Sequence, residues 1–145
     1  MFLVHTSLMF LSVALRAYHA RMRATHHVFM GLACTSVIFH SVNYATRNSH
    51  GVVHHMYKYP TLLFNGVKAA DAAMVGVTIA HNVLSFRGNM SVCKRSIILT
   101  QGVVTFYLFV VGRIHKRYCF DKRHGDLWHG LIHVIVTASA HLTLL

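Results

Sequence analysis

Two histidines with helical spacing, His129 and His133, lie in the apolar stretch "WHGLIHV" near the end of the sequence. Residues four apart share one face of a helix, and this spacing lets two imidazoles bind the same metal ion. Catalytic zinc typically takes three protein ligands and leaves one position for water. His40 lies in another apolar stretch and is the natural third ligand. We therefore predict a zinc site formed by His40, His129 and His133.

Two further polar residues are expected beside this site. Ser36 precedes His40 by four residues in "ACTSVIFHSVNYA", so a helix places both side chains on one face, where Ser36 can hydrogen-bond within the cluster. Asp71 is the only acidic residue inside an apolar segment, and its carboxylate can orient a bound water or accept its proton. We predict catalytic roles for Asp71 and Ser36. An ion pair between Asp71 and Lys68, three residues earlier, is an alternative explanation of the acid.

The elements that must position these residues are five apolar segments. Hydrophobic residues make up 54% of the 145-residue chain and charged residues only 12%, about half the usual share of a soluble domain. A membrane-spanning helix needs about 20 mostly apolar residues. We therefore predict an all-α integral membrane bundle of four to five transmembrane helices, forming one domain over residues 1–145. The segments are 1–18, whose apolar run is interrupted by Arg16, and 26–45, 61–86, 96–114 and 127–145.

Helices that alternate in direction place the three histidines at one depth. His40 is near the end of its segment, whereas His129 and His133 are near the beginning of theirs. Asp71 lies about ten residues into its own segment, which corresponds to roughly 15 Å at the rise of an α-helix. The spacing therefore predicts a close trio of histidines and a more distant aspartate.

The formal net charge of +11 requires anionic partners. Basic residues are spread over all the connections between the apolar segments, without the aromatic-interleaved basic pattern of a nucleic-acid-binding chain. We therefore expect no nucleic acid. Clustered Lys and Arg near helix ends attract anionic lipid headgroups, so we expect anionic membrane lipids and other membrane subunits of a larger assembly as partners.

The order of these motifs resembles the CREST superfamily, which contains alkaline ceramidases, progestin and adiponectin receptors and hemolysin III-like proteins. The matching stretches are "SVIFH", "KAADAAMVGV" and "HGDLWHGLIH". The resemblance implies a zinc ion held by His40, His129 and His133, with Asp71 and Ser36 beside it. It also implies amide hydrolysis on ceramide-like lipids, or a receptor with latent activity of that kind. The family has seven helices, whereas this chain has room for five, so it resembles a shortened member.

Two other interpretations stay open at this point. A b-type haem needs two axial histidines on facing helices at matched depth, and His40 with His133, or His81 with His141, could supply them. Alternatively, the chain is a non-catalytic accessory subunit of a large membrane assembly, such as a mitochondrial respiratory complex, with a vestigial metal site. The expected location is accordingly the mitochondrial inner membrane or an endomembrane.

Overall fold

The described part of the chain is entirely helical. The computed structural model describes residues 2–49, 61–86, 91–118 and 122–144, and no strand occurs in these ranges. The prediction of an all-α fold is confirmed, since each helix overlaps one of the apolar segments. The connections at 50–60, 87–90 and 119–121 lie outside the described residues, as do the contacts expected there between basic side chains and lipids. The helices are α1 (Phe2–His19), α2 (Arg23–Ser49), α3 (Thr61–Phe86), α4 (Val92–Tyr118) and α5 (Lys122–Thr143).

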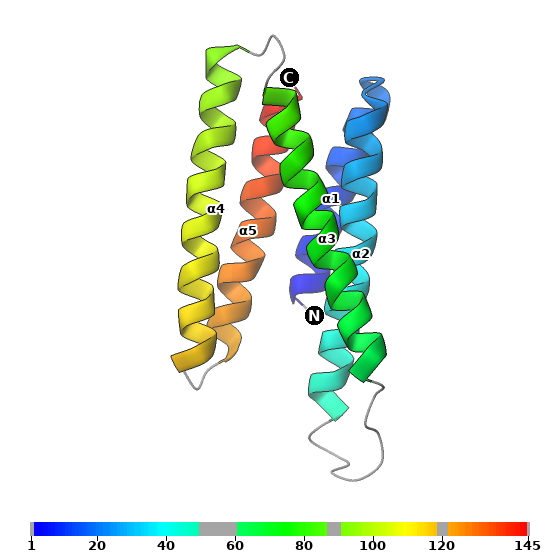
Figure 1. The fold of residues 1–145 in the computed structure, drawn as a ribbon, viewed down its shortest axis with the longest axis vertical. Helices are drawn as coiled ribbons and strands as arrows, with labels where there is room; N and C mark the ends of the chain where they lie inside the picture. Colours follow the sequence, from blue (N-terminus) through cyan, green and yellow to red (C-terminus); the bar gives the residue numbers. More distant parts are fainter. Residues whose placement is uncertain (1, 50–60, 87–90, 119–121, 145) are drawn as a thin grey trace.

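The five helices alternate in direction along one long axis (Figure 1). Helix α3 packs on α2, α2 on α1, α1 on α5, and α5 on α4. The first segment, which the sequence marks as the least continuous apolar run, therefore lies between α2 and α5. These two helices carry the three histidines, so α1 is in a position to contact both of them.

The core is built around one face of α1. Its buried residues recur every three or four positions, which is the period of one helical face. Phe10 of α1 packs against Phe29 of α2 with ring centroids 6.4 Å apart. Small residues on α1, including Ala14 and Ala17, are fully buried and let the neighbouring helices approach closely. The buried face of α1 comprises Leu3, Thr6, Ser7, Phe10, Val13, Ala14 and Ala17.

A tight turn joins α1 to α2. The backbone N–H of Met22 donates to the carbonyl of Ala17 at 2.8 Å, and that of Arg21 donates to the carbonyl of Tyr18 at 3.0 Å. This pair of bonds is the Schellman motif that closes a helix C-terminus. Arg21 takes the left-handed conformation that the motif requires, with φ of 58°. The turn reverses the chain within a few residues, which holds α1 and α2 side by side.

Two of the helices are long and apolar enough to cross a membrane. Within the described residues these are α2 over Arg23–Ala45 and α4 over Val92–Val111. Most of the apolar window of α4 lies at the surface of the protein, since only 6% of it is buried. Its large exposed residues include Leu99, Val103, Phe106, Tyr107 and Phe109.

Candidate metal centre

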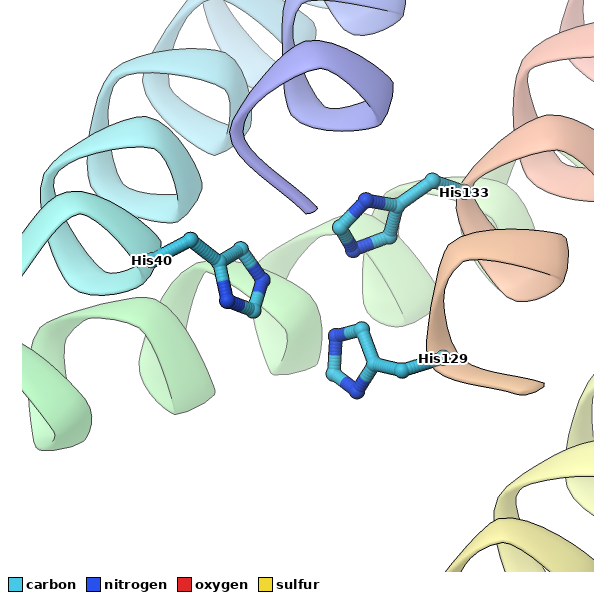
Figure 2. A group of neighbouring side chains, drawn as sticks. All are labelled: His40, His129 and His133. Carbon is cyan, nitrogen blue, oxygen red and sulfur yellow. The ribbon is translucent and has the colours of Figure 1, made fainter. Parts of the chain in front are cut away.

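Three histidines from two helices form one cluster, called here the histidine cluster (His40, His129 and His133). One ligand atom from each residue lies within 4.8 Å of the others. The ring centroids of His40 and His129 are 4.9 Å apart, those of His40 and His133 5.4 Å, and those of His129 and His133 4.8 Å. Figure 2 shows the three rings converging from α2 and α5 on a common space. The predicted convergence is confirmed, and the cluster can hold a metal ion.

Antiparallel packing of α2 and α5 brings these residues together. His40 is near the C-terminal end of α2, whereas His129 and His133 are one turn apart in the first half of α5. Because α2 and α5 run in opposite directions (Figure 1), these regions lie at the same end of the bundle. His40 and His133 are almost completely buried, with 3% and 5% of their surfaces exposed, and His129 is half-buried.

The donor set suits a transition-metal ion. Imidazole nitrogen is a ligand for zinc, copper, iron and nickel. In a tetrahedral zinc site with Zn–N distances of about 2.0–2.1 Å, the ligand nitrogens are roughly 3.3 Å apart. The largest spacing within the histidine cluster is 4.8 Å, so side-chain rotations that shorten it by roughly 1.5 Å give that geometry. The alternative of a haem between His40 and His133 stays a prediction.

His133 is held by side chains of α1. Its Nδ1 atom lies 3.0 Å from Oγ1 of Thr6 and 3.4 Å from Oγ of Ser7. The ring of Phe10 packs against the imidazole with centroids 5.1 Å apart. All three α1 residues belong to the buried face described above. The orientation of His133 is therefore set by a helix that supplies no member of the histidine cluster.

Asp71 and Ser36 are connected to His133 through a row of hydroxyl groups. Asp71, which is half-buried, has the hydroxyls of Thr35 and Ser36 as side-chain hydrogen-bond partners. Oγ of Ser36 lies 3.0 Å from Oγ of Ser7, which in turn lies near Nδ1 of His133. The expectation that Ser36 hydrogen-bonds within the site is met, but through Ser7 as an intermediate. Their assigned catalytic roles stay predictions.

In the structure, the side-chain hydrogen-bond partners of Asp71 are hydroxyl groups of α2, not Lys68 as the alternative explanation of the acid would require. The carboxylate is directed to hydroxyl groups of α2, whereas Lys68 is exposed. The Oδ1 atom of Asp71 is buried and has no hydrogen-bond partner among the described residues. Asp71 is therefore part of the interface between α2 and α3.

A small cleft opens beside the histidine cluster. Its volume is about 90 Å³, and His40 forms part of its wall together with Asp126 of α5. The absence of a side chain at Gly130 lets the ring of Phe2 lie against α5, because a Cβ atom there would overlap that ring. The cleft thus has both apolar and polar residues in its wall and includes one member of the histidine cluster. The other lining residues are Phe2, Leu3, Val4, Asn43 and Tyr44.

The second histidine pair considered for haem is separated into two unrelated contacts. Nε2 of His81 lies 3.0 Å from Oγ1 of Thr25, and Nε2 of His141 lies 2.8 Å from Oγ of Ser12. Each ring nitrogen is thus paired with a hydroxyl of a neighbouring helix. The His81 contact is partly buried and the His141 contact is exposed, and the two do not form a shared ligand site.

Sequence reasoning did not identify Thr6, Ser7 or Asp126 as parts of the site. A usable signal existed for the first two, because a pair of hydroxyl residues interrupts the apolar run "FLVHTSLMF" in the same way as Ser36 and His40 interrupt theirs. Asp126 precedes His129 by three residues, which is a helical neighbour position. Comparison of the chain with protein-family models, with curated proteins and with solved structures gives no match.

Proposed function

We propose that this chain is a small multi-pass membrane protein with a zinc centre at His40, His129 and His133, and that the centre hydrolyses amide bonds in lipids. The observation that carries the proposal is the convergence of three histidines from two separate helices on one buried space. Two histidines on one helix face are common by chance in a histidine-rich chain. A third from an antiparallel helix at the same depth is a more specific arrangement.

Membrane insertion of the whole bundle is part of the proposal. Besides the two helices that are apolar enough to span, exposed apolar residues line α3, including Val75, Val77 and Ile79. Contiguous apolar surface of this kind is rare on soluble monomers and is typical of membrane or protein interfaces. A bilayer covers the outer faces of α3 and α4 at once. The basic connections then face anionic headgroups.

The residues around the cluster fit hydrolytic chemistry. Zinc bound to three histidines supplies hydroxide at neutral pH. Ser7 and Ser36 form a row of hydroxyl groups between His133 and Asp71. The Asp71 carboxylate at the far end of this row is the proton acceptor. The cleft lined by His40 adjoins the cluster. Its apolar and polar lining residues suit a substrate with a hydrocarbon chain and a polar head.

The proposal is tested by metal analysis and lipid turnover on one purified protein. The wild-type chain, reconstituted in lipid, is expected to contain close to one zinc per chain and to release fatty acid from an N-acyl sphingoid lipid. The Asp71→Asn variant is expected to keep its zinc and to lose most turnover. Wild-type protein without zinc refutes the metal centre. Zinc without turnover, or equal turnover in Asp71→Asn, refutes the catalytic role.

A second candidate is a non-catalytic subunit of a larger membrane assembly. The feature that favours it is the apolar outer surface of α4. Within the described residues, α4 packs extensively against α5 alone. This surface can be covered by neighbouring subunits as well as by lipid. The candidate predicts co-purification in a large complex under mild detergent, with zinc bound and no turnover. A haem subunit would instead show a Soret absorption band in the purified protein.

A further inference from the structure

The contacts of His133 specify which of its two ring nitrogens carries hydrogen. A neutral imidazole has one N–H donor and one lone pair for a metal, and the partner of the first nitrogen decides which is which. In Figure 2 one ring nitrogen of His133 is directed toward α1 and the other toward His40 and His129. The nitrogen near α1 is Nδ1, because that atom is within hydrogen-bond distance of Thr6 and Ser7.

Each hydroxyl of α1 has the carbonyl oxygen of Leu3 as an acceptor for its own hydrogen. Oγ1 of Thr6 donates to the carbonyl oxygen of Leu3 at 3.1 Å, and Oγ of Ser7 donates to the same carbonyl oxygen at 2.7 Å. Each hydroxyl has a single hydrogen but two acceptor lone pairs. A hydroxyl whose hydrogen is on Leu3 can only accept from His133. The hydrogen between Thr6 and His133 must then belong to Nδ1, which leaves the lone pair of His133 on Nε2, the nitrogen that faces the cluster.

We infer that Thr6 and Ser7, the α1 hydroxyl pair, are positioning residues for the metal centre, a conclusion that rests on the proposed zinc site. They hold His133 as the Nδ1–H tautomer and aim Nε2 at the metal. Hydrogen bonding to the second nitrogen of a ligand histidine fixes its tautomer and orientation, and loss of such a partner costs about 10–100-fold in metal affinity. Phe10 restrains the same ring from its side.

The α1 hydroxyl pair also connects the metal ligand to the rest of the polar network. Ser7 lies 3.0 Å from Ser36, and Ser36 is a hydrogen-bond partner of Asp71. Ser7 accepts from Ser36 when its own hydrogen is on Leu3, and donates to Ser36 when Ser36 turns to Asp71. In both arrangements Thr6 remains the acceptor for Nδ1–H, because its own hydrogen stays on the carbonyl oxygen of Leu3. Thr6 is therefore expected to have the larger influence on His133.

The chain supplies a matched control on the same helix. Ser12 of α1 donates to the carbonyl oxygen of Met9 at 2.6 Å and lies 2.8 Å from Nε2 of His141 on α5. This contact repeats the Thr6–His133 arrangement about two turns away, between the same two helices. His141 is not a member of the histidine cluster. Loss of the Ser12 hydroxyl therefore removes a hydrogen bond between the same two helices, at a more exposed position, without touching the metal centre.

The test measures zinc affinity and the visible spectrum of the cobalt-substituted protein. Thr6→Val, which keeps the shape of the side chain, is expected to weaken zinc binding about 10–100-fold and to change the cobalt absorption bands. Thr6→Ser keeps the hydroxyl and is expected to restore both. Ser12→Ala is expected to behave as wild type. Wild-type affinity and an unchanged cobalt spectrum in Thr6→Val overturn the inference.

A measurement on the unmodified sequence keeps the inference testable if Thr6→Val does not fold. Nitrogen NMR of metal-free protein, with the His133 signals assigned by their loss in His133→Gln, reports which ring nitrogen carries hydrogen. Hydrogen on Nδ1 supports the inference, and hydrogen on Nε2 overturns it. Failure of the wild-type protein to bind zinc is a different result, since it refutes the proposed metal centre while the tautomer is still measured.

Discussion

His129 offers the cleanest single perturbation of the histidine cluster. It is half-buried, whereas His40 and His133 are almost completely buried. Replacing His133 would also remove a partner of the α1 hydroxyl pair and open space in the core. His129→Ala removes one metal ligand with less loss of packing. Its effect on metal binding is therefore separable from its effect on folding.

The size of the effect follows from the number of ligands. Zinc sites with four protein ligands bind with about 10–16 kcal/mol of apparent free energy, so one ligand carries roughly 3 kcal/mol. This corresponds to about a hundredfold increase in the dissociation constant. At a free zinc concentration one hundred times the wild-type dissociation constant, zinc stabilises the wild-type protein by about 2.7 kcal/mol. The His129→Ala variant gains only about 0.4 kcal/mol under the same conditions.

The assay combines a competition titration against a chromophoric chelator with thermal unfolding in detergent, with and without zinc. His141→Ala is the matched control, because His141 lies on the same helix and is also half-buried, but bonds to Ser12 instead of joining the cluster. It is expected to show wild-type zinc stabilisation. If His129→Ala and wild type bind zinc equally well, His129 is not a ligand, and the three-histidine centre is wrong.

Two further substitutions test the membrane environment and the α1–α2 turn. Val103→Arg places a charge on the outer face of α4, where residue 103 is 71% exposed; near the middle of a membrane span this costs about 2.5–3.5 kcal/mol of insertion free energy. We expect less protein in the carbonate-resistant membrane fraction for Val103→Arg but not for Val92→Arg at the helix start, and equal fractions would contradict a lipid-facing α4. Arg21→Gly relieves a left-handed backbone at φ of 58° and is expected to raise the free energy of unfolding by about 1 kcal/mol, seen as a higher unfolding temperature. An unchanged or lower temperature would show that Arg21 makes a compensating contact.

The sequence by itself determined the helices and the depth of the histidines. Apolar segments of spanning length predict helices, and alternation of direction then places the end of α2 level with the beginning of α5 (Figure 1). The four-residue spacing of His129 and His133 fixes them on one face of α5 whatever the helix packs against. These conclusions need only the period of the helix and the order of the segments, so they did not require knowledge of contacts between helices.

Only the tertiary structure decided which helices touch and how each is rotated. Nothing in the spacing of Thr6 and Ser7 indicates that α1 lies between α2 and α5 and meets His133. Counting residues along α3 likewise does not show that the Asp71 carboxylate meets Thr35 and Ser36 of α2. Periodicity tells which residues share a face of one helix. Which face meets which neighbour depends on side-chain packing between helices that are distant in sequence.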